Sequence, residues 1–194
     1  NPFLRYRRTL YSYVVANQHG MSDADYVALV ERIDSNLHGL VGHGFLVTPY
    51  YRDARLSTAL GFSNTGGIWV KDETGQVGGS HKARHLMGIM LYLEVVRALG
   101  WFVEKPRLGI ASCGNAALAA AVVARAADYH LDVYIPVNAN PAVVARLIEL
   151  GAHITRCERR ADEVGDPCFL RFMEALDHGT VPFCCQGSAC GLTL

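Results

Sequence analysis

The chain has 194 residues, enough for one ordinary domain or slightly more, and 51% of them are hydrophobic against 19% charged. Its 18 basic residues balance its 18 acidic residues, so the composition indicates neither disorder nor electrostatic binding of nucleic acid. A neutral chain favours small molecules or proteins as partners. We therefore expect a folded protein that does not bind nucleic acid.

Membrane insertion is not expected either. The longest apolar run, residues 116–127, is broken by Arg125, whereas a spanning helix needs about 20 apolar residues. The six cysteines form neither a CxxC pair nor the even framework of a small secreted domain. These features favour a soluble, cytoplasmic protein with reduced and mostly buried thiols.

Residues 1–67 are predicted to form an N-terminal region of helices and loops that packs on the rest of the chain. Residues 22–37 make an amphipathic helix in which Ser22 and Asp25 are placed as a capping pair. Its apolar stripe consists of Tyr26, Leu29, Val30 and Ile33. The glycine-rich residues 39–52 are predicted to be a loop, and residues 54–61 a short helix.

From residue 68 to residue 180, short β-rich runs alternate with helical patterns, which predicts an α/β fold with a parallel sheet and flanking helices. Asn140–Pro141 and Asp166–Pro167 are typical of a helix cap followed by the first helical residue. The predicted strands are residues 67–72, 107–112, 131–136, 152–157 and 181–185, and the predicted helices are 80–99, one starting near 115, 141–150 and 167–178. We expect residues 181–194 to begin a second, truncated α/β domain.

Two loops that follow predicted strands carry candidate chemistry, because ligands of open parallel sheets bind beyond the carboxyl ends of the strands. In the first, residues 75–84, Lys82 falls in the first turn of a helix, where the helix dipole favours the neutral, nucleophilic amine. This placement suits imine formation with a carbonyl group. Taken alone, the position favours an ordinary solvated lysine.

The second loop, residues 111–117, contains Ser112, Cys113, Gly114 and Asn115. Backbone amides in a small turn at a helix start are a natural seat for a carboxylate or phosphate. The alternative is that Gly114 and Asn115 only turn the chain and cap the next helix. Two such loops in one sheet favour the ligand-binding interpretation.

Other motifs are weaker. His81 and His85 have the spacing of two zinc ligands, but Lys82 replaces the glutamate that would act as general base, so a metal-dependent hydrolase is a minor alternative. The loop before Lys82 lacks the serine or threonine of a P-loop, and the dinucleotide fingerprint GxGxxG is absent.

Taken together, "VGGSHKAR" and "ASCGN", about thirty residues apart, resemble the lysine and asparagine motifs of the fold type II, tryptophan synthase β-like, pyridoxal-phosphate enzymes. "NPFLRYR" and "TPYYRDARLSTALG" before "IWVKDE" resemble threonine synthase and its relatives. The resemblance covers almost the whole chain and implies a lyase or synthase that acts on a small amino acid.

The resemblance also implies roles for individual residues. Lys82 would hold pyridoxal 5'-phosphate as a Schiff base and then remove the substrate's α-proton, so that a β- or γ-substituent is eliminated or replaced. Asn115 would bind the ring hydroxyl of the cofactor, while Ser112, Cys113 and Gly114 would bind the substrate carboxylate. Family members commonly form homodimers, and a homodimer is expected here on that ground alone.

The chain also departs from the family pattern. Val77 and Gly78 replace a proline and a threonine, His81 replaces a phenylalanine, and Cys113 replaces a second serine. The glycine-rich loop for the cofactor phosphate is not found, so we expect this chain to be the N-terminal portion of a larger enzyme. The competing hypothesis is a non-catalytic relative that binds a metabolite or a partner subunit.

Overall fold

The computed structural model describes residues 1–63, 65–188 and 190. Its N-terminal region is helical and consists of α1 (Pro2–Arg5), a 3-10 turn η1 (Arg7–Thr9), α2 (Tyr11–Gln18) and α3 (Asp23–Val41). α3 starts where the sequence predicts, because the Ser22 hydroxyl accepts a hydrogen bond from the Asp25 amide at 3.1 Å. It runs past the predicted end and stops at Gly42, which adopts the left-handed conformation. The predicted stripe of α3 is buried.

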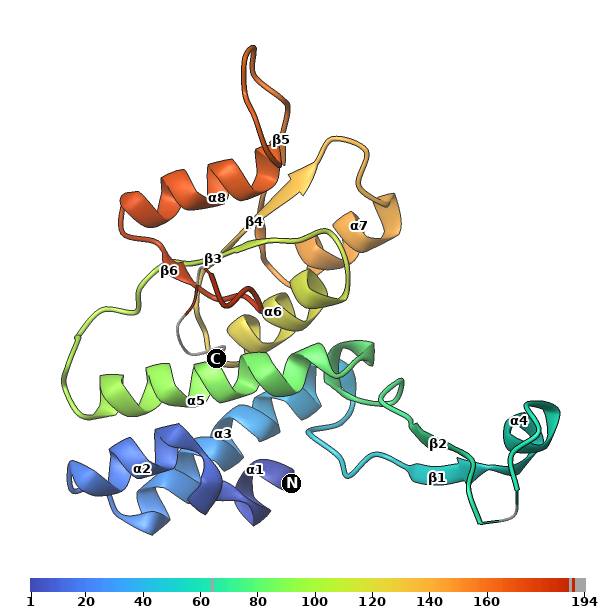
Figure 1. Cartoon of the computed structure of the whole chain (residues 1–194). Helices are drawn as coiled ribbons and strands as arrows, with labels where there is room; N and C mark the ends of the chain where they lie inside the picture. Colours follow the sequence, from blue (N-terminus) through green and yellow to red (C-terminus); the bar gives the residue numbers. More distant parts are fainter. Residues whose placement is uncertain (64, 189, 191–194) are drawn as a thin grey trace.

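A four-stranded parallel sheet forms the second half of the molecule, as the sequence predicts. Its strands lie in the order β5 (His153–Cys157), β4 (Leu131–Pro136), β3 (Leu108–Ala111) and β6 (Val181–Pro182). α8 (Pro167–Asp177) covers one face, and α6 (Asn115–Ala126) and α7 (Pro141–Glu149) cover the other (Figure 1). The side chains of Asn140 and Asp166 cap α7 and α8, each followed by a proline at the first helical position.

The segment predicted to open a second domain begins in this same sheet. Val181 and Pro182 pair with Leu108 and Gly109 of β3, so they form its edge strand. Residues 189 and 191–194, which belong to the same prediction, lie outside the described residues.

One part of the predicted topology is wrong. β2 (Ile68–Lys71) is a strand, but it pairs antiparallel with β1 (Tyr50–Asp53) instead of joining the parallel sheet. β1 falls in a segment that was predicted to be a loop. A parallel neighbour requires a crossover that packs on the sheet. Among the described residues between β1 and β2 there is one short helix, α4 (Ala54–Ala59), and the chain returns antiparallel to β1. The parallel sheet therefore begins at β3.

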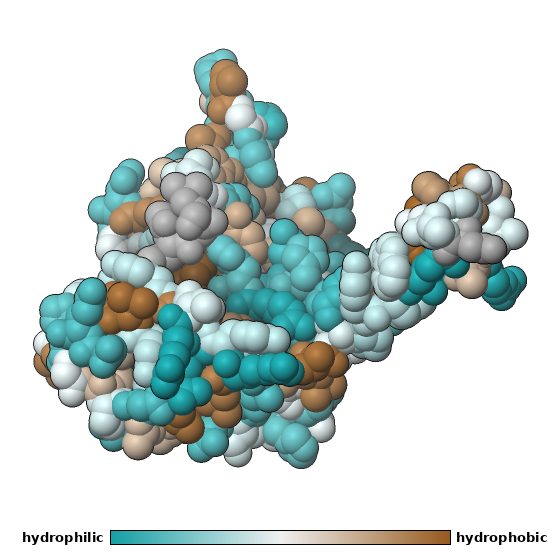
Figure 2. Space-filling view, turned by 60° about the horizontal axis from the view of Figure 1, so that its bottom comes forward, coloured by the Kyte–Doolittle hydropathy of each residue, from teal (hydrophilic) through white to brown (hydrophobic). Residues whose placement is uncertain are grey.

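β1, α4 and β2 together form an arm that projects from the body of the protein (Figures 1 and 2). Its aromatic side chains are exposed, and the rings of Tyr50 and Trp69 stack with their centroids 5.4 Å apart. The base of the arm leads directly from β2 into the loop that carries Lys82.

α5 (Lys82–Ala98) lies in the middle of the molecule, between the N-terminal helices and α6 (Figure 1). Most of its side chains are buried, including Leu86, Met87 and Met90 at 0% exposure. Its one fully buried carboxylate, Glu94, is bound by Arg32, Arg97 and the Tyr129 hydroxyl. The core therefore fixes α5, and with it the position of Lys82. Within the described residues, no helix is both long and apolar enough to cross a membrane.

Candidate active site

The loop before Lys82 depends on two consecutive glycines. Gly78 and Gly79 have φ values of +71° and +70°, a left-handed conformation that glycine adopts at little cost. A Cβ on Gly78 would lie 3.2 Å from the Cα of Ala119 in α6, so the loop packs directly against that helix. Lys82 follows as the first residue of α5. The small residues before the lysine thus allow the loop to approach α6.

Gln76 anchors the same loop to the N-terminal region. Its buried side chain accepts a hydrogen bond from the Leu46 amide at 3.1 Å and donates one to the Leu46 carbonyl at 3.0 Å. Its oxygen also accepts from the Val77 amide. These bonds tie Gln76 to the backbone at Leu46, which fixes the entry to the glycine pair.

Arg84 and Glu73 complete the support of the loop. The Arg84 guanidinium donates to Glu73 Oε2 at 2.9 Å and to Thr48 Oγ1 at 3.1 Å, and the Thr48 hydroxyl donates to Glu73 Oε1 at 2.6 Å. Burial opposes the charge of Glu73, but these partners outweigh it and lower the pKa of the carboxyl. No sequence motif predicts this network.

The amine of Lys82 differs from those of the other two lysines in the sequence. Lys71 Nζ donates to the Thr48 carbonyl at 2.6 Å, and Lys105 Nζ donates to the Ala127 and Asp128 carbonyls at 2.8 and 3.0 Å. Lys82 is half-buried, and its amine has neither a hydrogen bond nor an ion pair with any described residue. It is the lysine that remains available for chemistry in this part of the chain.

The chain after β6 passes beside Lys82. Burial raises the pKa of the Cys185 thiol, and the Lys82 charge opposes that shift. Gln186 donates from Nε2 to the Ala111 carbonyl at 3.3 Å, at the carboxyl end of β3. Residues 184–186 therefore bridge the start of α5 and the end of β3.

The second predicted loop lies against the first. α6 begins at Asn115, and Gly78 contacts the same helix at Ala119, one turn further on. The structure thus brings the Lys82 loop and the loop from Ser112 to Asn115 to neighbouring positions. The individual roles assigned to Ser112, Cys113, Gly114 and Asn115 remain predictions.

The start of α6 has no side-chain cap. The helices α1, α3, α4, α7 and α8 each begin with a side-chain oxygen that accepts from a backbone amide, whereas α2, α5 and α6 do not. Gly114 occupies the N-cap position and Asn115 is the first residue of α6, so Gly114 turns the chain into the helix as the alternative expected, but the Asn115 side chain does not cap it. The amides at this end are left to an anionic ligand or to water.

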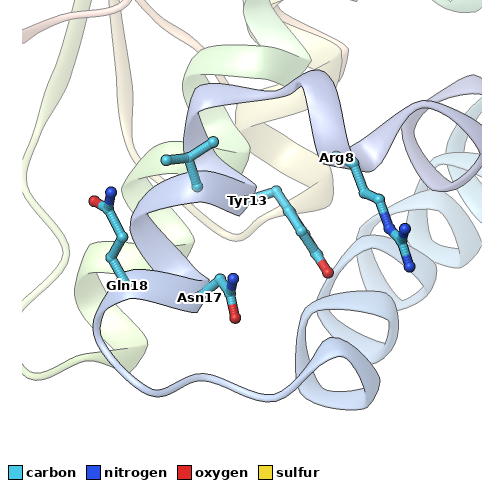
Figure 3. Close-up of a pocket in the computed structure, with 5 residues that line it drawn as sticks. Arg8, Tyr13, Asn17 and Gln18 are labelled. Carbon is cyan, nitrogen blue, oxygen red and sulfur yellow. The ribbon is translucent and has the colours of Figure 1, made fainter.

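The remaining candidate sites are weaker than the Lys82 site. A hollow of about 480 Å³ lies on α2 and is lined by Arg8, Tyr13, Val14, Asn17 and Gln18 (Figure 3). None of these residues belongs to the Lys82 site, and the hollow contains one charged side chain. Among the described residues, no three His, Cys, Asp or Glu side chains gather in a metal-binding cluster.

Most of the described cysteines are buried, namely those at 157, 168, 184 and 190. Cys113 is exposed and Cys185 is half-buried. The prediction that most thiols are buried is therefore confirmed.

A family described as "Pyridoxal-phosphate dependent enzyme" matches residues 42–180. No curated protein matches the chain. Among solved structures, a hydrogen sulfide-producing enzyme from Fusobacterium nucleatum is 16% identical, with a TM-score of 0.52 over 70% of this chain and 42% of its own. An O-ureido-L-serine synthase is 21% identical, with a TM-score of 0.55 over 70% and 40%. Maize serine racemase is 19% identical, with a TM-score of 0.56 over 79% and 43%.

At these identities the similarity establishes the fold. The chain spans less than half the length of each of these structures. The predicted α/β fold and the resemblance to fold type II enzymes are confirmed.

Proposed function

The chain belongs to the pyridoxal-phosphate dependent enzymes, and from that premise we propose that the full-length protein acts on a small amino acid at the Lys82 site. In this proposal the α-proton of the substrate is removed and a β- or γ-substituent is then eliminated or replaced. The reaction is that of a lyase or a synthase. The observation that carries the proposal is the Lys82 amine, which is the one lysine amine in the described residues without a hydrogen bond or ion pair.

The residues around Lys82 fit the cofactor of this family. An aldehyde requires an amine whose lone pair is accessible and which no carboxylate or carbonyl holds, as is the case for Lys82, and an acidic ligand requires amide donors, which the uncapped start of α6 offers. Two buried polar atoms beside the site, His85 Nε2 and Gln186 Oε1, have no hydrogen-bond partner in the described part of the chain. Buried polar atoms without partners are rare in native proteins, and a polar ligand would supply them.

When bound, pyridoxal phosphate supplies an electron sink that stabilises negative charge at the substrate's Cα. Lys82 would hold the cofactor covalently and, once displaced by the substrate amine, take the α-proton on its neutral Nζ. The amides at the start of α6 would bind the substrate carboxylate and keep Cα within reach of Nζ. Asn115, the first residue of that helix, would orient the cofactor ring.

The decisive experiment is borohydride reduction of the full-length protein mixed with pyridoxal phosphate, followed by peptide mass mapping. We expect the reduced adduct on Lys82 and a visible absorption band that Lys82→Ala abolishes. Lys105→Ala is the matched control, because the Lys105 amine is occupied by two backbone carbonyls. A folded protein without an adduct on Lys82 would support the alternative of a non-catalytic binding domain.

Product analysis then separates the reaction types. Elimination from serine or threonine releases ammonia and a 2-oxo acid, whereas replacement yields a new amino acid and racemisation yields only the other enantiomer. The similar solved structures include a sulfide-producing enzyme, a synthase and a racemase, so all three assays are needed. A purely racemised product would overturn the proposed lyase or synthase activity.

A further inference from the structure

His85 lies on the same face of α5 as Lys82. Residues three apart on a helix are neighbours, with about 5–6 Å between their Cβ atoms, and helical side chains lean towards the N-terminus of their helix. The His85 ring therefore leans towards the turn that contains Lys82. The two side chains interact electrostatically, since the Lys82 charge lowers the pKa of His85.

The ring of His85 is fixed on one side and unsatisfied on the other. It has a hydrogen bond with the backbone of Cys184, which follows β6. Its Nε2 atom is buried and has no partner among the described residues. In a neutral imidazole that donates one N–H to a backbone carbonyl, the other nitrogen keeps its lone pair. Nε2 is then a buried acceptor that lacks a donor.

Lys82 carries unpaired donors on a flexible side chain one turn away. We propose that His85 is a positioning residue of the site, whose Nε2 accepts a hydrogen bond from Lys82 Nζ and holds the amine ready for the cofactor's aldehyde. The inference rests on the proposed role of Lys82. It provides a partner for the buried Nε2 atom of this half-buried ring. It assigns to His85 a function separate from the metal-ligand alternative.

The protonation state of His85 agrees with an acceptor role. Burial lowers its pKa, the Cys184 backbone opposes that shift, and the Lys82 charge lowers it further. The thiols of Cys184 and Cys185 also lie near the pair, and burial raises the pKa of both, so neither adds a negative charge at neutral pH. His85 is therefore neutral at neutral pH, and the acceptor is lost as the pH falls through its lowered pKa.

The first test needs no cofactor. Histidine side-chain nitrogen resonances of the full-length protein would be followed through a pH titration, with and without Lys82→Met. We expect Lys82→Met to raise the apparent pKa of His85 and to shift its Nε2 resonance, while exposed His81, also adjacent to Lys82, changes less. An unchanged Nε2 resonance would overturn the inference, whatever the cofactor experiment shows.

The second test measures the rate at which Lys82 captures pyridoxal phosphate. His85→Phe removes the acceptor, and we expect capture to slow about tenfold, the scale of one hydrogen bond. His85→Gln keeps an acceptor and should restore most of the rate, and His81→Gln is the control on the exposed side. Circular dichroism verifies that each variant is folded.

The outcomes separate the two proposals. If the wild-type protein captures no cofactor, the proposed function fails, and the resonance titration alone decides whether His85 contacts Lys82. If the wild-type protein captures cofactor and His85→Phe does so equally fast, the positioning role is wrong. If His85→Gln is as slow as His85→Phe, His85 acts through packing and the acceptor role is wrong.

Discussion

Substitution of Gly78 by alanine tests whether the lysine loop depends on its close approach to α6. Alanine at φ +71° costs about 1–2 kcal/mol for the left-handed conformation. Its Cβ would also lie 3.2 Å from the Cα of Ala119, and a backbone atom cannot move aside by rotation. Overpacking of this kind costs about 1–3 kcal/mol, so we expect Gly78→Ala to destabilise the protein by about 2–5 kcal/mol in total.

Gly79→Ala is the matched control. Gly79 has nearly the same φ, +70°, but no atom lies within 4 Å of the position of its Cβ. It should therefore show only the conformational cost of about 1–2 kcal/mol. Urea unfolding at equilibrium gives both values, and an unchanged slope shows that the unfolded state is not altered. Equal destabilisation by the two substitutions would refute the contact between the loop and α6.

Three further predictions follow from the network and the thiols. Glu73→Gln should destabilise the protein by about 1–2 kcal/mol at neutral pH. Because the pKa of Glu73 is lowered in the folded state, the difference in stability between wild type and variant should shrink as the pH falls through that pKa, which an acid titration of the unfolding free energy measures. Glu94→Gln should cost about 2–3 kcal/mol in urea unfolding, since the buried carboxylate accepts charge-assisted bonds from two arginines. At pH 8, iodoacetamide should label exposed Cys113 in the native protein. Cys184 is buried and its pKa is raised to about 11, so it should react only after unfolding. Labelling of Cys184 in the native protein, detected by peptide mass mapping, would contradict the structure.

Neighbouring residues were sufficient to predict where several helices begin. The serine at 22, the asparagine at 140 and the aspartate at 166 each accept from a backbone amide within the first helical turn, so their effect is readable from neighbouring residues. The parallel strands were also predictable, because largely buried strands such as residues 131–136 form mostly apolar runs between helical patterns.

The pairing of β1 with β2 could not be predicted in the same way. β1 contains two tyrosines, an arginine and an aspartate, and its burial pattern shows no buried face, so no alternation marks it as a strand. What makes it a strand is the ladder with β2, which lies about 18 residues later in the chain and is visible only once the chain has folded back.

The residues that hold the Lys82 loop could not be predicted from the sequence for a related reason. Arg84 binds Glu73 and Thr48, which lie 11 and 36 positions away. Gln76 binds the backbone of Leu46, 30 positions away. No spacing rule connects such residues, because the partners meet only after α5 has packed against the N-terminal region. Sequence motifs predicted Lys82 as the cofactor lysine, while the residues that hold its loop required the structure.

The departures from the family pattern gain a physical meaning from this geometry. The resemblance assigns a threonine to position 78, but a β-branched residue at φ +71° is a strained outlier, and its Cβ would meet the Ala119 backbone. The loop of this chain therefore follows a path that a threonine could not share without moving α6. Because α6 begins at Asn115, such a movement would also shift the backbone amides at the start of that helix. The glycine at 78 and the alanine at 119 are thus one packing solution, and threonine at 78 would require α6 to move with it.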